Sequence, residues 1–380
     1  YMAYAGSVTA SDYLTGPDAN VSLIARLAYS YNDRYFATAS WRRDYAGRLP
    51  KENNYGDFPA VTLGWKISNE KFFKKSDFIS LLKLRASWGR VGNLSSIGLN
   101  YKSALLKKSS WTEQAQYGPE ANNIWNTLIY NGSALNPDLT WETSEQTNIG
   151  IDARFLDNRL SFTMDWYSKQ TKDLLVEVGT NAASGFATQY QNAGTVKNTG
   201  LELSMGWRDQ IGKEFKYGVN VNMAYNKNEV TEVNNANHFI EGGNDLLAQS
   251  TGRFVRMEEG HPIGYFYGYK TDGVIQNQND LQAYLDQNCK GNAANSKQGA
   301  SIKPGDLKFV DVDGNGVIND DDKTDLGNPH PDVTMGLTLS AEYKGFDFSV
   351  TTNQLYRESQ PEPQPKSNIL EPTGSILANR

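Results

Sequence analysis

One stretch of the chain, residues 311–322, combines residue types and a spacing that could bind a metal ion. It begins Asp-Val-Asp-Gly-Asn-Gly, with a glycine, Gly316, at the sixth position. The predicted ligands alternate along the loop and are Asp311, Asp313, Asn315, Val317 through its carbonyl, Asn319 and Asp322. Calcium takes six to eight hard oxygen ligands, and this spacing brings such ligands to one point. We therefore expect structural Ca²⁺ here; the alternative is a solvated Asp/Gly/Asn-rich turn that binds nothing.

No other pattern of residues indicates catalysis. The three histidines, His238, His261 and His330, lack a mutual metal-binding spacing. The sequence contains no G-x-S-x-G motif and no Gly-rich phosphate loop of the G-x-x-x-x-G-K-[ST] type. We therefore predict that the protein is not an enzyme.

Aromatic residues in the polar connections are stronger candidates for ligand binding. Their flat faces stack on sugar rings and pack against peptides. The alternative for each residue is packing within the loops or contact with another protein. The candidates are Trp111, Trp125, Tyr190, Phe239, Tyr265 and Tyr267.

The elements that carry these loops have the alternation of β-strands. Between Val333 and Tyr343, apolar residues occupy every second position, and the pattern returns after Lys344-Gly345 from Phe346 to Val350. Successive strand side chains point to opposite faces, so one face is apolar and the other polar. About ten such strands of roughly ten residues are expected between residues 21 and 355. We expect residues 1–20 to form a loop or frayed strand and residues 356–380 to form a loop.

The connections between the predicted strands alternate between short and long. The long connections are residues 92–145, 173–195 and 227–332. Short turns at one end and long loops at the other are typical of outer-membrane barrels, whose long loops are extracellular. Aromatic residues are also expected near both strand ends on the apolar face: Tyr31, Tyr35, Phe155, Phe215, Tyr343 and Phe346 near short turns, and Trp41, Trp88, Trp166 and Tyr225 near the opposite ends. We predict an all-β fold, an antiparallel transmembrane β-barrel facing the lipid bilayer; a soluble sandwich is the alternative.

Composition narrows the function classes further. The formal net charge is -6, which argues against a nucleic-acid partner. The sequence contains no run of about 18 apolar residues, so no transmembrane helix is predicted. The single cysteine, Cys289, cannot form a disulfide within the chain.

Several segments resemble SusC/RagA-type TonB-dependent outer-membrane transporters. They occur in the family's order over roughly residues 21–355, and together they are specific. The segments are Tyr31-Asn32-Asp33-Arg34-Tyr35, Tyr55-Gly56-Asp57-Phe58-Pro59-Ala60, Gly64-Trp65-Lys66-Ile67-Ser68, Leu82-Lys83-Leu84-Arg85-Ala86-Ser87-Trp88-Gly89, Asn136-Pro137-Asp138-Leu139-Thr140-Trp141-Glu142, Gly260-His261-Pro262-Ile263-Gly264, Pro304-Gly305-Asp306-Leu307-Lys308 and Gly327-Asn328-Pro329-His330-Pro331.

The resemblance implies a 22-stranded barrel with an N-terminal plug in its lumen. It also implies a location in the cell outer membrane of a Gram-negative bacterium, energy from the TonB complex and a SusD-like surface lipoprotein as a lid. The cargo would be an oligosaccharide or oligopeptide. The plug and the TonB-binding segment are not visible in this chain, so we expect it to be the C-terminal barrel portion without its last strands. The alternative function is a soluble, secreted β-rich glycan-binding module with a calcium-stabilised loop.

Overall fold

The computed structural model describes residues 19–73, 78–97, 136–179, 188–235, 238–242 and 253–356. It also describes the backbone of three short strands: Ala115–Tyr117 (β5), Asn126–Leu128 (β6) and Ser133–Ala134 (β7). The chain divides into two compact units. One comprises Tyr1–Gly64, Ala86–Thr147 and Lys169–Thr195, and the other comprises Trp65–Arg85, Asn148–Ser168 and Val196–Arg380.

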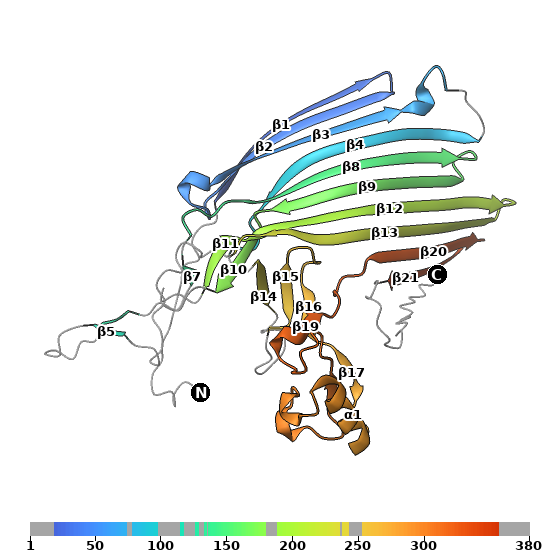
Figure 1. Ribbon diagram of the computed structural model, residues 1–380. Helices are drawn as coiled ribbons and strands as arrows, with labels where there is room; N and C mark the ends of the chain where they lie inside the picture. The colour runs from blue at the N-terminus through green and yellow to red at the C-terminus, as the bar shows by residue number, and fades with distance from the viewer. Residues whose placement is uncertain are drawn as a thin grey trace, which may run out of the picture. The chain divides into compact units, whose positions relative to one another are not determined.

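The largest element is a ten-stranded sheet (Figure 1). Its strands lie side by side in the order in which they occur along the chain. That order is β1-β2-β3-β4-β8-β9-β12-β13-β20-β21. The strands are Asn20–Tyr31 (β1), Tyr35–Ala46 (β2), Tyr55–Lys66 (β3), Ile79–Asn93 (β4), Glu142–Phe155 (β8), Leu160–Lys172 (β9), Gly194–Ile211 (β12), Phe215–Val233 (β13), Val333–Tyr343 (β20) and Phe346–Tyr356 (β21). The predicted all-β antiparallel fold is confirmed.

The two faces of this sheet differ in polarity, as the alternation predicts. On one face Val219 lies opposite Leu339, and Leu339 lies opposite Val350 on the next strand. These apolar residues are not packed into a core: Leu339 is 44% exposed, Leu63 52% and Leu27 71%. Among the described residues, therefore, no second layer of protein covers this apolar face. A soluble sandwich would bury these side chains, whereas a lipid-facing wall exposes them.

Several strands extend further than their apolar patterns predict. β13 continues to Val233, β4 continues to Asn93 and β8 begins at Glu142. The predicted long connections, 92–145, 173–195 and 227–332, are therefore shorter at these ends. The added segments are polar; Asn226 and Asn228 of β13 both donate to Asn198 of β12, at 3.2 and 2.8 Å. Backbone pairing thus continues beyond the residues that alternate in polarity.

The connection between β13 and β20 contains further regular structure that is not predicted from its sequence pattern. A four-stranded sheet combines Phe239–Gly242 (β14), Val255–Glu258 (β15), Tyr265–Tyr269 (β16) and Lys323–Asp325 (β19). A second sheet pairs Thr271–Val274 (β17) with Leu307–Phe309 (β18), and Gln278–Asn288 forms the helix α1. Among the described residues, no helix is long and apolar enough to cross a bilayer.

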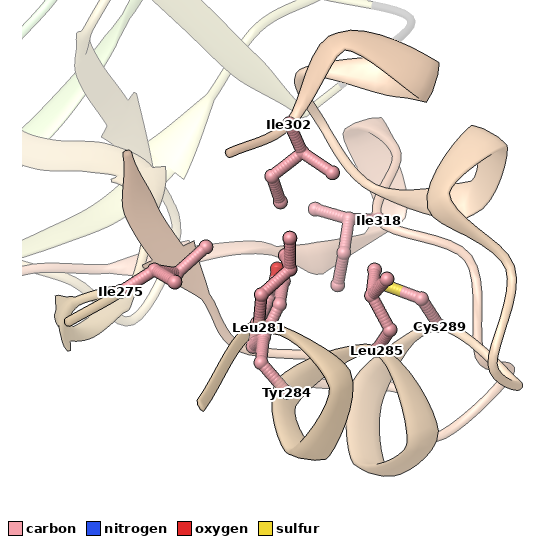
Figure 2. Close-up of a cluster of buried hydrophobic side chains, with 7 residues drawn as sticks. All are labelled: Ile275, Leu281, Tyr284, Leu285, Cys289, Ile302 and Ile318. Carbon is pink, nitrogen blue, oxygen red and sulfur yellow. The ribbon is translucent and has the colours of Figure 1, made fainter. Parts of the chain in front are cut away.

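We call these two small sheets and α1, with the loops between them, the insertion. A separate hydrophobic core stabilises the insertion (Figure 2). The side chain of Asn277 caps α1 by accepting the backbone N–H groups of Asn279 and Asp280, both at 3.0 Å. The spacing of Leu281, Tyr284 and Leu285 then places the three side chains on one face of the helix. They pack in one buried cluster with Ile275, Cys289, Ile302 and Ile318.

A second buried cluster lies at the base of the long connections. It consists of Leu49, Ile97, Leu139 and Leu175. Strands Leu175–Gly179 (β10) and Thr188–Asn192 (β11) pair here, and β7 joins β11. Three connections of one compact unit, those that follow β2, β4 and β9, are thus tied together by burial of apolar side chains.

Candidate metal centre and ligand-facing loops

The structure brings together three of the predicted calcium ligands. Oxygen atoms of Asp311, Asp313 and Asp322 all lie within 4.8 Å of one another. Asp322 is fully buried, Asp311 is half-buried and Asp313 is exposed. A buried carboxylate beside two others is unfavourable unless hydrogen bonds or a cation compensate its charge.

Backbone groups of the loop hold these carboxylates in place. Asn315 and Gly316 donate their N–H groups to Asp311, at 3.1 and 2.7 Å. Val312 and Asn319 donate theirs to Asp322, both at 2.8 Å. Gly316 has a φ of 74°, a left-handed conformation that glycine adopts without steric cost. The glycine at the sixth position of the loop thus makes a sharp turn.

The other predicted ligands form hydrogen bonds within the loop. Asn315 donates its side-chain amide to Asp313 at 2.7 Å and accepts the N–H of Val317 at 2.7 Å. Asn319 caps the short 3₁₀ turn Asp320–Asp322 by accepting the N–H of Asp321 at 2.7 Å. The donor set is all oxygen, which suits a hard cation such as Ca²⁺ or Mg²⁺ and not a soft one.

The hydrophobic core of the insertion also holds the loop in place. Ile318 belongs to the buried cluster, and its N–H donates to the carbonyl of Asn295 at 2.7 Å. At the end of the loop, the hydroxyl of Tyr269 donates to Asp320 at 2.5 Å. Burial and this hydrogen bond raise the pKa of Tyr269 to about 12. Two contacts outside the carboxylate group thus anchor the loop to the insertion.

Two of the predicted ligand-contact aromatics enclose an arginine. The guanidinium carbon of Arg256 lies 4.1 Å from the ring centroid of Phe239 and 3.4 Å from that of Tyr267. Arg256 also pairs with Glu241 at 2.9 Å and with Glu258 at 3.4 Å. This cation–π and ionic contact network orders β14, β15 and β16 against one another. Arg256 could not be predicted as a site residue, because no local motif links it to these rings.

The remaining aromatic candidates have different surroundings. Tyr265 is only 1% exposed, and its hydroxyl donates to Glu258 while its ring stacks on His261 with centroids 4.6 Å apart. Its ring therefore has almost no free surface in this arrangement. Tyr190 packs against the buried cluster at the base of the long connections. Trp111 and Trp125 lie outside the described residues.

The polar face of the ten-stranded sheet carries an ionic cluster. Arg85 of β4 donates to Asp152 of β8 at 2.8 and 3.0 Å and to Asp165 of β9 at 2.9 Å. One guanidinium thus links three neighbouring strands, using the fork of donors that lysine lacks. This arrangement pairs the charge of Arg85 with two carboxylates within the polar face of the sheet.

Comparison with known proteins agrees with this two-sided sheet. The family model described as TonB dependent receptor-like, beta-barrel, matches residues 1–248. TonB-dependent receptor SusC of Bacteroides thetaiotaomicron is 34% identical over 333 residues, covering 87% of this chain and 30% of that protein. The chain belongs to the TonB-dependent receptor family, of the SusC/RagA type.

Other relatives support the same assignment. TonB-dependent receptor P3 of Formosa agariphila is 34% identical over 353 residues, covering 91% of this chain and 32% of that receptor. Among solved structures, the RagAB peptide transporter matches with a TM-score of 0.67 and 26% identity, covering 88% of this chain and 33% of that one. The chain thus spans about a third of the length of the TonB-dependent receptors that it matches.

Family membership identifies the surroundings of the exposed apolar face. TonB-dependent receptors of this type are outer-membrane proteins, so the face that carries Leu27, Leu63 and Leu339 lies against lipid. The location predicted from the sequence is confirmed. The predicted resemblance to SusC/RagA-type transporters is confirmed as well.

Proposed function

We propose that this chain is part of the wall of a TonB-dependent importer for oligomeric nutrients. The cargo would be an oligosaccharide or an oligopeptide, and the partners would be the TonB complex and a SusD-like surface lipoprotein. The protein would act by gated transport and not by chemistry. Family membership supports the TonB-dependent mechanism, and similarity to the RagAB peptide transporter supports the oligopeptide class. The oligosaccharide class rests on the resemblance of the sequence to SusC/RagA-type transporters.

The observation that carries this proposal is the opposed polarity of the two sheet faces. Exposed leucines lie on one face, and the Arg85 cluster lies on the other. A wall between lipid and a watery passage requires this distribution of side chains. The alternative, a soluble glycan-binding module, would leave the same leucines in water at roughly 25 cal/mol for every Å² of apolar surface.

The cargo class can be tested with the complete transporter in its own bacterium. Its gene is deleted, and uptake of labelled oligosaccharides, labelled oligopeptides and the corresponding monomers is compared with the parent strain. We expect uptake of one oligomer class to be lost, uptake of monomers to be unchanged, and a protonophore to reproduce the loss. Unchanged uptake of both oligomer classes would contradict the proposal.

The SusD-like partner can be tested on the same strains. The complete transporter is purified in mild detergent without cross-linking, and the proteins that accompany it are identified. We expect one surface lipoprotein in a fixed ratio to the transporter, and its deletion should reduce uptake of the same oligomer class. A transporter that is isolated alone and works fully without any lipoprotein would contradict this part of the proposal.

We also propose that the loop 311–322 binds one Ca²⁺ ion with a structural role. The convergence of three carboxylates within 4.8 Å, the buried position of Asp322 and the turn at Gly316 support the fit. Asp311, Asp313 and Asp322 would hold the ion through charged oxygens. The ion would neutralise their mutual repulsion and stiffen the insertion.

A further inference from the structure

The polar face of the sheet contains a cavity of about 380 Å³ between β4, β8 and β9. Strand side chains alternate between the two faces, which places the polar residues of its lining on the same side as Arg85. Ligand pockets range over roughly 300–1,000 Å³, so this cavity suits one unit of an oligomer and not the whole oligomer. The polar lining residues are Lys83, Asp152, Arg154, Ser161 and Thr163.

The carboxylates beside the cavity already have partners. Asp152 accepts two hydrogen bonds from Arg85, and the hydroxyl of Thr163 donates to it at 3.4 Å. Asp165 accepts a further hydrogen bond from Arg85, across Gly150 of β8. A Cβ atom on Gly150 would lie only 2.9 Å from Nη2 of Arg85, so the absence of a side chain there lets Arg85 reach from β4 to β9. Arg85 thus draws both carboxylates toward itself.

Two other arginines on this face have no such pairing. Arg154 lines the cavity, and Arg208 lies two residues beyond Gly206, whose carbonyl accepts the hydroxyl of Ser161 at 3.3 Å. Both arginines are exposed. Within the part of the chain that the structure describes, neither forms an ion pair with a carboxylate. Two unpaired guanidinium groups therefore lie on β8 and β12, on either side of the strand that carries Ser161.

The chemistry of this group of residues suits a carboxylate ligand. The N–H donors of a guanidinium form a fork that binds both oxygens of a carboxylate, and the group stays charged at every physiological pH. The hydroxyl of Ser161 can also donate a hydrogen bond, and Leu81 adds an apolar contact to the lining. The cavity lies near the short turn between β8 and β9, and short turns of outer-membrane barrels are periplasmic.

We propose that Arg154 and Arg208 form a carboxylate-binding site for acidic cargo at the periplasmic end of the passage. The site holds one unit of the oligomer, a uronic acid of an oligosaccharide or an acidic residue of an oligopeptide. This inference rests on the proposed transport function and narrows its cargo from oligomers in general to acidic ones. A neutral oligomer offers the two guanidinium groups no opposite charge.

Thiol modification of the complete transporter in mild detergent measures the electrostatic potential at this site. Accessible cysteines elsewhere are first replaced; Cys289 is fully buried. Ser161→Cys is treated with a negatively or a positively charged methanethiosulfonate, and the ratio of the two rates is compared with that at Thr351→Cys. Thr351 is exposed on the same face and pairs with the uncharged Thr338. We expect the negative reagent to be favoured several-fold at Ser161→Cys, because unpaired arginines raise the local potential.

Substitution of the arginines identifies the source of this potential. Arg154→Gln and Arg208→Gln should each lower the preference of Ser161→Cys for the negative reagent. Lys213→Gln is the control, because it removes an exposed positive charge in the turn between β12 and β13 and should leave the preference unchanged. A rate ratio equal to that of Thr351→Cys, or no reaction with either reagent, overturns the site.

Protection of Ser161→Cys distinguishes the two sources of the carboxylate. Tetragalacturonate and tetraglutamate are added in turn, each beside its methyl ester, which has a similar shape without the charge. We expect at least one acid to slow the modification while its ester does not, and the acid that protects names the cargo class. Equal protection by acid and ester, or protection by neither acid, overturns the assignment. Modification needs no transport, so this failure is separate from a failure of the uptake test.

Discussion

Asn192 and Thr140 form a reciprocal pair in which a side-chain amide replaces a strand partner. The side-chain Oδ1 of Asn192 accepts the backbone N–H of Thr140 at 3.0 Å, and its side-chain Nδ2 donates to the backbone carbonyl of Thr140 at 3.1 Å. The same nitrogen donates to the carbonyl of Asp173 at 2.9 Å. Asn192 therefore ties together the ends of two long connections, directly beside the buried cluster of Leu139 and Leu175.

Replacement of Asn192 by alanine should loosen the base of these connections. Three hydrogen bonds to the backbone would be lost, two of them partly buried and one exposed, and a typical hydrogen bond contributes about 0.5–1.5 kcal/mol to stability. We expect faster amide hydrogen exchange for residues 136–142 in the complete protein. Gln191→Ala is the matched control, because the described hydrogen bond of the Gln191 side chain is to Gln189 on the same strand. Equal exchange in the two variants would show that the hydrogen bonds of Asn192 do not stabilise these connections.

Removal of calcium should loosen the loop 311–322. A ligand at 100 times its dissociation constant stabilises the state that binds it by about 2.7 kcal/mol. We expect Ca²⁺ to slow exchange of the loop amides in the wild type but not in Asp322→Asn. Asp321→Asn is the control, because Asp321 is exposed and lies outside the carboxylate group. Identical exchange of the wild type in Ca²⁺ and in chelator would rule out the proposed site.

A charge on the apolar face should cost far more than a charge on the polar face. Met205 and Ser204 are neighbours on β12, with Met205 on the lipid-facing side and 41% exposed. An arginine near the bilayer midplane costs about 2–4 kcal/mol on the lipid side. We expect Met205→Arg to lower the midpoint of denaturant unfolding in vesicles, and Ser204→Arg to change it little. A reversed order of the two variants would mean that the faces are assigned incorrectly.

The insertion should lose stability in acid through Asp280. The Asp280 carboxylate accepts hydrogen bonds from Lys308 at 2.7 Å and from the N–H of Gln276 at 2.8 Å. The hydrogen bond from Lys308 is the main cause of the lowered pKa of Asp280. Because the folded pKa is lowered, its contribution to stability is present above the unfolded value of about 3.9 and is lost as the pH falls through the folded value. We therefore expect exchange protection factors in α1 to fall below about pH 4.

Asp280→Asn provides the comparison for this pH effect. The variant should show lower protection near neutral pH and a weaker dependence on acid. Asp286→Asn, on the same helix, keeps the pair of Asp280 with Lys308 and should retain the wild-type profile. The explanation fails if Asp280→Asn and Asp286→Asn give the same profile.

The sheet was predictable from the sequence because its strands cross an apolar layer. Residues such as Leu337 and Leu339 must alternate with polar ones wherever one face meets lipid, so the pattern marks each strand. Outside that layer no such demand exists, and the polar ends of β12 and β13 carry no periodic pattern. Their pairing depends instead on side-chain contacts such as those from Asn226 and Asn228 to Asn198.

The insertion was missed for a different reason. Its helix has a visible start, Asn277, and helical spacing at Leu281, Tyr284 and Leu285, but its apolar positions are few and its strands are short. The convergence of Asp311, Asp313 and Asp322 could be predicted because their spacing is local. The enclosure of Arg256 between Phe239 and Tyr267 could not, because it joins three separate strands.

The most direct test of the account is a nitroxide scan along β20. Labels at consecutive positions from Thr334 to Ser340, in the complete protein in vesicles, are compared for collision with oxygen and with a nickel chelate. A wall between lipid and water predicts a period of two, with oxygen dominant at Met335, Leu337 and Leu339 and the chelate dominant at the positions between them. Uniform accessibility along the strand, or shielding of Met335, Leu337 and Leu339 from oxygen by protein, would contradict a wall between lipid and water.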